Sequence, residues 1–179
     1  YGSGGELPKQ ETMPVTPESP YALSKQYTER AAMQLADHNE FDAVGLRYFN
    51  VFGPRQYPDG EYAAVIPKFI HLMLDDDRPV VFGDGEQSRD FVFIEDVVQA
   101  NIKAAESNCT DAVLNVARGK RTTINELIDR LNEILGTAIE PVYEAPRPGD
   151  IRHSGESIST ARDAVGYEPA IGFTDGLEQ

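Results

Sequence analysis

The sequence predicts an α/β fold, because strand-like and helix-like segments alternate along most of the chain. Short apolar runs at 43–49 and 112–116 have the length and the residue types of buried strands. Longer segments between the strands carry helix start signals, and Thr123-Ile124-Asn125-Glu126 is a complete capping-box pattern. With 179 residues the chain is long enough for one domain of ordinary size, and it contains no internal repeat.

The first half of the chain opens with a turn-rich stretch that contains several prolines. Ser19 is a suitable helix N-cap and Pro20 fits the first helical turn, so a helix is expected from Pro20 to about Asp37. The elements expected next are a strand at 43–49, a helix at 65–74, strands at 79–82 and 91–94 around a tight turn at 83–85, and a helix at 95–106.

The second half alternates in the same way. The capping box introduces a helix that is expected to end at Gly136, because glycine favours the left-handed conformation that closes many helices. The other elements expected here are a strand at 112–116, a strand near 139–143, a loop at 146–150 and a short helix near 159–164.

Acidity is the strongest compositional feature. Thirty Asp and Glu residues against sixteen Lys and Arg residues give a formal net charge of −14. Such a surface repels phosphate backbones, so no nucleic-acid partner is expected. Two interpretations of the acidity stay open: adaptation to a salt-rich cytosol, or a surface that only keeps the protein soluble.

Other features of the composition exclude several classes of protein. No apolar run approaches the ~18 residues that a membrane span needs, so no membrane partner is expected. The single cysteine, Cys109, rules out an intrachain disulfide and fits a reducing, cytoplasmic setting. The three histidines are scattered and there is no Cys/His cluster, so no metal site is expected.

Tyr21 and Lys25 lie four residues apart on the first expected helix, so their side chains share one face. At an effective dielectric constant of ~20, an ammonium group about 6 Å away stabilises a phenolate by roughly 3 kcal/mol. Such a pair could take a proton from a substrate hydroxyl group. Spacing alone nevertheless favours the simpler interpretation, a surface helix with an incidental Tyr and Lys.

Four ordered blocks of sequence reverse that preference. The first, Pro20-Tyr21-Ala22-Leu23-Ser24-Lys25 followed by Glu29, resembles the PYxxSKxxxE segment of the NAD-dependent epimerase/dehydratase family, the extended short-chain dehydrogenase/reductases that act on nucleotide sugars. The other blocks that resemble this family are RYFNVFGPR at 47–55, GDG followed by RDF and EDV within 83–97, and RPGD at 147–150. The resemblance runs from residue 1, where Tyr1-Gly2 and the proline-rich loop also match, to about residue 154.

The resemblance implies the carboxyl-terminal part of a Rossmann-type doubly wound fold, together with a small mixed α/β substrate-binding lobe. Residues 1–60 are expected to form the end of the NAD-binding domain, with the Tyr-Lys helix and the following strand. Residues 61–179 are expected to form mainly the substrate-binding lobe, with the strand at 112–116 returning to the Rossmann sheet.

The sequence also departs from the family pattern. The glycine-rich dinucleotide fingerprint is absent, and Gly2-Ser3-Gly4-Gly5 does not replace it because no strand precedes it and no helix follows it. The family's catalytic Ser or Thr would precede Tyr1. We therefore expect this chain to be the carboxyl-terminal half of a longer enzyme, and to be inactive by itself.

The resemblance assigns roles around the cofactor, which is NAD. Tyr21 is implied as the catalytic acid and base, and it also contacts the cofactor. Lys25 is implied to bind the nicotinamide ribose and to help Tyr21 lose its proton. Phe49 is expected beside the nicotinamide, although a core aromatic residue at a strand end is an equally good interpretation.

The resemblance also assigns roles around a UDP-sugar substrate. Asn50 is expected to donate to the sugar diphosphate, and Asp150 to accept from the ribose hydroxyl groups. Arg89 and Arg147 are expected on the phosphates, because planar forked donors suit them, although Arg89 beside Asp90 could be purely structural. Residues expected to frame the uracil and the diphosphate are Val65, Lys68 and Phe82.

Ser154 is expected beside the 2-substituent of the sugar. The segments 62–68 and 149–154 resemble those of epimerases that act on UDP-N-acetylglucosamine. A small residue at this position leaves room for an acetamido group, whereas a large aromatic residue leaves room only for a hydroxyl group. The alternative is that Ser154 only caps the following turn.

The function implied is an NAD-dependent UDP-hexose 4-epimerase that works through a 4-keto intermediate. Its expected substrates are UDP-glucose and UDP-galactose, and also their N-acetylated counterparts. The alternatives are a dTDP-glucose 4,6-dehydratase or UDP-glucuronate decarboxylase of the same fold, or an inactive domain that binds nucleotide sugars and dimerises. A homodimer is expected, because the Tyr-Lys helix helps to form the dimer in similar proteins.

Overall fold

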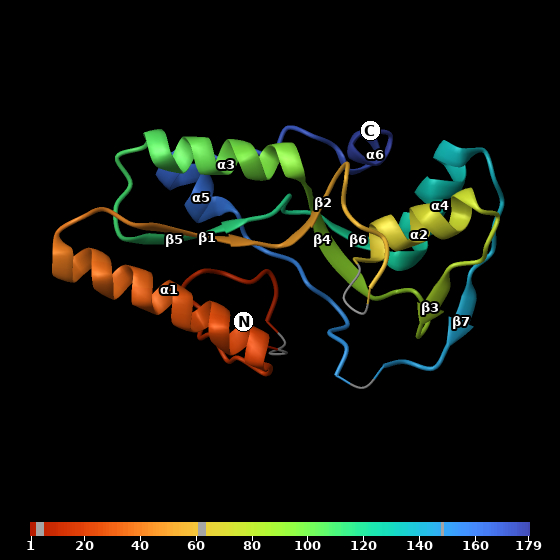
Figure 1. Ribbon diagram of the computed structural model, residues 1–179, viewed down its shortest axis with the longest axis horizontal. Helices are drawn as coiled ribbons and strands as arrows, with labels where there is room; N and C mark the ends of the chain where they lie inside the picture. Colours follow the sequence, from red (N-terminus) through yellow and green to blue (C-terminus); the bar gives the residue numbers. More distant parts are fainter. Residues whose placement is uncertain (3–5, 61–63, 148) are drawn as a thin grey trace.

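The computed structural model describes residues 1–2, 6–60, 64–147 and 149–179 (Figure 1). The residues outside the described part are Ser3 to Gly5, residues 61–63, which include the first two of the segment 62–68, and Pro148 of the RPGD block. The α/β class is confirmed, because helices alternate with mostly parallel strands. Within the described part of the chain, each helix is too short or too polar to cross a membrane.

One group of elements surrounds a pair of parallel strands. β1 (Val44–Tyr48) pairs in parallel with β5 (Ala112–Val116), with Leu46 opposite Leu114. α1 (Pro20–Asn39) lies on one face of this pair, and α3 (Ile94–Glu106) lies on the other with α5 (Ser159–Val165) beside it (Figure 1). The buried core between α3, α5 and the strands includes Val97, Leu114 and Tyr167.

The second group is built on β4 (Ser88–Phe93), which has β2 (Asn50–Phe52) parallel on one side and β6 (Arg121–Thr123) antiparallel on the other. Its remaining elements are α2 (Val65–Leu74), α4 (Ile124–Leu135), α6 (Phe173–Leu177), and the parallel pair β3 (Val80–Phe82) and β7 (Val142–Glu144). The core of this group is aromatic: the Phe52 ring centre lies 5.4 Å from that of Phe93 and 5.6 Å from that of Phe173.

β4 joins the two cores. Successive side chains of a strand point to opposite faces, and here Phe91 and Phe93 belong to the aromatic core while Val92 belongs to the core under α3. The strand expected at 112–116 is β5, which pairs with β1. The division of the chain near residue 60, with this strand returning to the Rossmann sheet, stays a prediction.

Local helix signals are confirmed in detail. The Ala22 amide donates to Ser19 Oγ at 3.1 Å at the start of α1. At α4 both capping-box bonds are present, and the Glu126 amide donates to Thr123 Oγ1 at 3.0 Å. Gly136 closes α4 with φ of 67°, in the left-handed region that glycine adopts easily.

Strand pairing differs from the expectation of two strands joined by a tight turn. β3 and β4 do not pair with each other: β3 pairs with β7, about sixty residues later in the chain, and β4 lies between β2 and β6. The turn at 83–85 therefore connects two sheets. β2, β6 and α6 escaped prediction because elements of three to five residues are too short to show periodicity.

Candidate active site

Seven of the residues assigned to the substrate surround one pocket of about 320 Å³. They come from β2, the first turn of α2, β3, β4 and the loop after β7, and they are Asn50, Val65, Lys68, Phe82, Arg89, Arg147 and Asp150. α2 opens at the pocket, and its N-cap residue Ala64 supplies no side-chain acceptor to the free amides of the first turn. Such a helix end favours a negatively charged ligand.

Most of the charged side chains at this pocket are cationic. Lys68, Arg89 and Arg147 line it together with one carboxylate, Asp150, although the whole chain carries a net charge of −14. Arg89 Nη2 lies 3.8 Å from Asp150 Oδ1, and Arg89 Nη1 donates to the Ser88 carbonyl at 2.9 Å. Burial lowers the pKa of the Arg89 guanidinium, and the nearby Asp150 carboxylate opposes this shift. The guanidinium stays charged, because an arginine does not lose its proton in a protein. The pocket therefore suits an anion.

Two further side chains shape the pocket. The Asn50 amide donates through Nδ2 to the Asp90 carbonyl at 3.0 Å, which holds the side chain at the start of β2. Phe82 lies at the end of β3, and the guanidinium carbon of Arg147 is 3.7 Å from the centre of its ring. The ring of Phe82 thus offers an aromatic surface directly beside a cationic group.

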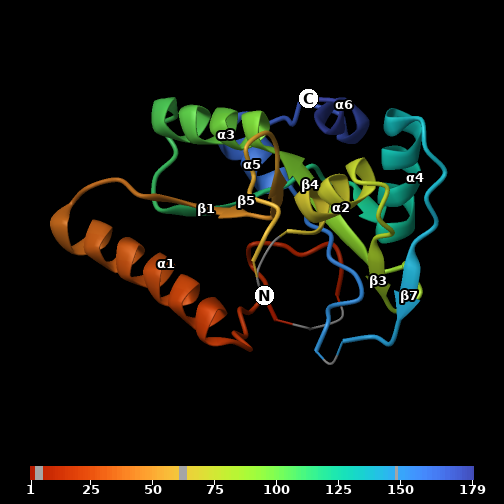
Figure 2. The ribbon, with the colours of Figure 1, turned by 45° about the vertical axis from the view of Figure 1, so that its right-hand side comes forward.

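A second hollow, of about 560 Å³, lies between α1 and β1 and is lined by Tyr21, Lys25 and Phe49. α1 lies on the opposite side of the molecule from β3 and β7 (Figure 2). Lys25 Nζ is 5.5 Å from the centre of the Tyr21 ring, so the two side chains share a face of α1. The Tyr21 side chain is exposed, with 70% of the residue accessible. The structure thus divides the predicted residues between two hollows.

Ser154 lines neither hollow. Its hydroxyl group donates to a carboxyl oxygen of Glu156, and its backbone amide donates to the Ser88 carbonyl at 2.9 Å. The structure therefore does not bring Ser154 together with the other predicted substrate residues.

The model of the NAD-dependent epimerase/dehydratase family matches residues 1–117. This chain belongs to that family. A UDP-N-acetylglucosamine 4-epimerase from Methanobrevibacter ruminantium, solved with UDP-N-acetylmuramic acid, is 43% identical over 99% of the chain with a TM-score of 0.95. A UDP-glucose 4-epimerase from Thermotoga maritima, solved with UDP-glucose, is 40% identical over 99% of the chain with a TM-score of 0.94.

Curated relatives agree with this assignment. A UDP-glucose 4-epimerase of Mycolicibacterium smegmatis is 34% identical over 99% of the chain. Family members named dTDP-glucose 4,6-dehydratase also match, one of them from Actinoplanes at 30% identity over 180 residues. The chain spans 57% of the length of each of the two solved epimerases and 56% of the Mycolicibacterium protein.

Two residues of the family motifs pair with each other, which the sequence did not indicate. Glu29, from the block that begins at Pro20, accepts from Arg47 Nε at 2.7 Å and from Arg47 Nη2 at 2.8 Å. The Tyr1 ring lies over the same guanidinium group at 4.7 Å, and these contacts raise the pKa of Arg47 further above its usual value. The bidentate pair links α1 to β1, the two elements that flank the hollow with Tyr21 and Phe49.

Two buried acids behind the pocket were also missed. Asp90 and Glu156 are almost fully buried, and burial raises the pKa of Asp90 to about 6 and that of Glu156 to about 7. Asp90 Oδ1 accepts from the Arg118 amide at 2.8 Å. The position of Asp90 directly before the apolar run 91–94 was the available signal for its burial. Glu156 lies in a polar stretch that gives no sign of burial.

Proposed function

We propose that the whole protein is an NAD-dependent nucleotide-sugar 4-epimerase, and that the residues described above form its nucleotide-sugar pocket and its proton-transfer site. One observation carries this proposal. Lys68, Arg89 and Arg147 gather around one pocket beside the aromatic ring of Phe82, in a chain that is otherwise strongly acidic. A nucleoside diphosphate combines the negative charge and the flat ring that such a pocket suits.

Within this proposal the pocket holds the UDP part of the substrate. The guanidinium groups of Arg89 and Arg147 bind the two phosphates, because planar forked donors match phosphate oxygens. Asp150 accepts from the ribose hydroxyl groups, and its separation of 3.8 Å from Arg89 leaves this ion pair loose enough to open for a ligand. The ring of Phe82 packs against the uracil.

Tyr21 and Lys25 are proposed to do the proton chemistry. In the reaction, the 4-hydroxyl group of the sugar is oxidised to a ketone and then reduced on the opposite face. Tyr21 Oη acts as a phenolate that the Lys25 ammonium stabilises; it takes the proton of that hydroxyl group, stays a neutral phenol while the ketone exists, and returns the proton in the second step. The exposure of Tyr21 allows its oxygen to reach a ligand.

The part of the second hollow near Tyr21 and Lys25 suits NAD, the cofactor of the family. The phenol of Tyr21 and the ammonium of Lys25 can both bind hydroxyl groups of a ribose, and Phe49 adds an aromatic side chain beside them. No described side chain forms a hydrogen bond with Tyr21 Oη, which leaves this atom available. When bound, NAD would supply the oxidation and the reduction at the sugar carbon.

The proposed substrates are UDP-glucose and UDP-galactose, together with their N-acetylated counterparts. The 43% identity to a UDP-N-acetylglucosamine 4-epimerase supports the second pair. Ser154 lines neither hollow, and its place beside the 2-substituent of the sugar is part of the proposal. Because its hydroxyl group is held by Glu156, its volume rather than its hydrogen bonding would admit the acetamido group. Ser154→Tyr in the whole protein is expected to abolish turnover of the N-acetylated pair and to spare the plain hexoses. An equal effect on both pairs would remove Ser154 from this role.

Product analysis by NMR tests the proposed reaction against the alternative in the same family. The whole protein is incubated with UDP-galactose, with UDP-N-acetylgalactosamine and with dTDP-glucose. A 4-epimerase converts the UDP-sugars to their epimers and keeps all hydroxyl groups. A 4,6-dehydratase instead releases water from dTDP-glucose and gives a 4-keto-6-deoxy sugar, and that result would overturn the proposal. Binding of UDP without any turnover would favour a nucleotide-sugar-binding domain.

The exposed face of α1 supports a homodimer as part of the same proposal. Leu23 and Tyr27 lie one helical turn apart and are 57% and 73% exposed, and Leu35 lies two turns further on at 56%. An apolar stripe of this kind on a helix suits a second copy of the same helix. Sedimentation of the whole protein before and after Leu23→Glu tests it, with loss of the dimer expected.

A further inference from the structure

The loop after β7 forms an arch over the turn between β3 and β4. We use the name arch for the described residues 145–147 and 149–151, which carry Arg147 and Asp150 to the pocket. Backbone hydrogen bonds join both ends of the arch to the segment that links β3 and β4. At one end the Gly83 amide donates to the Glu144 carbonyl at 2.8 Å, and at the other the Ser88 amide donates to the Arg152 carbonyl at 2.9 Å.

The arch has no packed core beneath it. A hollow of about 420 Å³ lies between it and the turn, and both Arg147 and Asp150 line this hollow as well as the pocket. The arch thus stands between two open spaces. Between its two backbone anchors, the described contacts that join the arch to the rest of the molecule are made by individual side chains.

Two of those contacts involve the nucleotide site itself. Arg147 lies over Phe82, and Asp150 lies 3.8 Å from Arg89. A bound nucleoside diphosphate would compete for all four side chains. These two contacts therefore cannot be what holds the arch when the pocket is filled.

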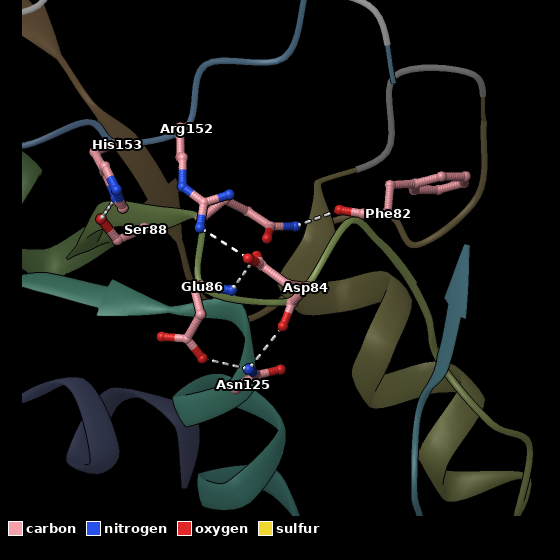
Figure 3. A network of polar contacts seen from close by, with 8 residues as sticks. Phe82, Asp84, Glu86, Ser88, Asn125, Arg152 and His153 are labelled. Carbon is pink, nitrogen blue, oxygen red and sulfur yellow. Dashed lines mark hydrogen bonds and ion pairs between the residues drawn. The ribbon is translucent and has the colours of Figure 1, made fainter. Parts of the chain in front are cut away.

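A third contact is independent of the pocket. Arg152 Nη2 donates to Asp84 Oδ2 at 2.8 Å, which ties the end of the arch to the turn (Figure 3). Neither residue lines the pocket, although both line the hollow beneath the arch. The Arg152 guanidinium also lowers the pKa of Asp84, so the carboxylate is charged at neutral pH.

Asp84 is itself firmly held, as Figure 3 shows. Its other carboxylate oxygen accepts from the Glu86 amide at 3.0 Å, and its backbone carbonyl accepts from Asn125 Nδ2 at 3.1 Å. Asn125 Nδ2 also donates to Glu86 Oε1 at 2.7 Å, and Asn125 lies in the first turn of α4. The turn is thus a fixed point to which the arch can be attached.

We propose that the Asp84–Arg152 ion pair is a latch that positions the arch, and through it Arg147 and Asp150, for binding of the nucleoside diphosphate. This inference rests on the proposed function, because it takes the pocket to be the UDP site. Asp84 and Arg152 are positioning residues, since neither touches the pocket. The latch holds the arch in the arrangement that the ligand requires, so the free protein does not have to order it on binding.

The exposure of the pair makes this proposal testable without unfolding the protein. The side chains of Asp84 and Arg152 are 54% and 60% exposed, and an exposed ion pair contributes little to global stability. Asp84→Asn removes the charge but keeps an oxygen for the Glu86 amide. Arg152→Gln removes the cation but keeps most of the aliphatic stem. Arg162→Gln is the matched control. Arg162 lies on α5, away from the arch, and forms a similarly exposed ion pair with Glu168.

The experiment measures UDP binding by calorimetry in the whole protein for the wild type, both single variants, the double variant and the control. Each single variant is expected to weaken UDP binding by about threefold to fivefold, the range that one exposed ion pair can supply. The double variant should lose no more than either single variant. Arg152→Lys should recover part of the affinity. Melting temperatures should stay unchanged, and KM for the nucleotide sugar should rise while kcat is kept.

The outcomes separate the latch from the proposed function. Wild-type protein that fails to bind UDP would overturn both. Wild-type binding that is unchanged in Asp84→Asn and Arg152→Gln would overturn the latch alone. Losses that add in the double variant would also overturn it, because the two residues would then act separately. An equal loss in the Arg162→Gln control would show a general effect of charge instead of a latch.

Discussion

The guanidinium carbon of Arg147 lies 3.7 Å from the centre of the Phe82 ring. This contact joins the two kinds of chemistry that the pocket offers, a cation for phosphate and an apolar ring for a base. It also brings the loop after β7 against the end of β3, two segments that are more than sixty residues apart in the sequence. Stacking on an aromatic face is a property of the flat guanidinium group that an ammonium group does not share.

Arg147→Lys is therefore expected to weaken UDP binding, although it keeps the charge. The variant loses both the stack on Phe82 and the forked donors for phosphate, and we expect the dissociation constant to rise about tenfold. Uridine, which has no phosphates, should lose much less affinity. Calorimetric titrations with both ligands check this. Arg130→Lys on α4, an exposed pair with Glu133 outside the pocket, is the control and should bind UDP as the wild type does.

Tyr21→Phe is expected to separate catalysis from binding in the whole protein. Tyr21 lines the hollow along α1 and not the UDP pocket, so UDP affinity should stay unchanged. Loss of the proton-transfer group should lower kcat by at least about a hundredfold. Lys25→Met should also lower turnover and in addition weaken NAD binding. Tyr27→Phe, an exposed tyrosine on the same helix, should keep normal turnover, and normal turnover in Tyr21→Phe would refute the assigned role.

Local sequence patterns predicted the helices well, because their signals lie within a few residues of each other. Ser19 and the capping box at 123–126 made the expected hydrogen bonds, and Gly136 closed α4. Local patterns could not predict in the same way which strands pair with each other. The turn at 83–85 suggested a pair of adjacent strands, but β3 pairs with a strand that lies about sixty residues away. Pairing between distant segments leaves no local trace in the sequence.

The residues predicted to bind the substrate came from the resemblance to a family, and the structure brings seven of them around one pocket. Their gathering depends on how the arch and β4 lie relative to the other elements, and no local pattern shows that arrangement. Glu29 and Arg47 were recognised as parts of motifs, but their pairing was not. The burial of Glu156 escaped notice because it arises from a distant contact, a bridge between Glu156 and Lys9 of the N-terminal segment.

Glu156 should make the stability of the protein depend on pH. Its pKa is raised by burial to about 7, from a model-peptide value near 4.5, so the folded state binds the proton more tightly than the unfolded state. The free energy of unfolding therefore falls as the pH rises through this range. Between about pH 5.5 and pH 8, the wild type should lose about 2 kcal/mol more than Glu156→Gln.

Urea unfolding of both proteins at the two pH values tests this difference. Glutamine can still accept from the Ser154 hydroxyl group, so the comparison mainly removes the titrating proton. Asp90 also has a raised pKa but is present in both proteins, which cancels most of its contribution. Parallel pH dependence in the two proteins would show that Glu156 does not titrate in this range.

Gly85→Ala should destabilise the protein more than Gly136→Ala, although both glycines have a positive φ, of 79° and 67°. Any residue other than glycine is strained there by about 1 kcal/mol. At Gly136 a new Cβ would meet open space, whereas at Gly85 it would lie 1.8 Å from Asn125 Oδ1. Asn125 would have to turn away and lose its hydrogen bonds to Asp84, Glu86 and Tyr143. We expect a loss of about 3 kcal/mol at Gly85 and about 1 kcal/mol at Gly136.

Repeating Gly85→Ala in a protein that lacks the Asn125 side chain separates the steric effect of the new Cβ from the strain of the backbone. In Asn125→Ala the obstructing side chain is gone, so adding Gly85→Ala should cost only the backbone strain of about 1 kcal/mol that Gly136→Ala shows. Thermal and urea unfolding of the two single variants, the double variant and Gly136→Ala give the four values needed. If Gly85→Ala costs the same with and without Asn125, the close approach of this turn to α4 does not restrict the residue at position 85. The cost would then arise from the backbone alone.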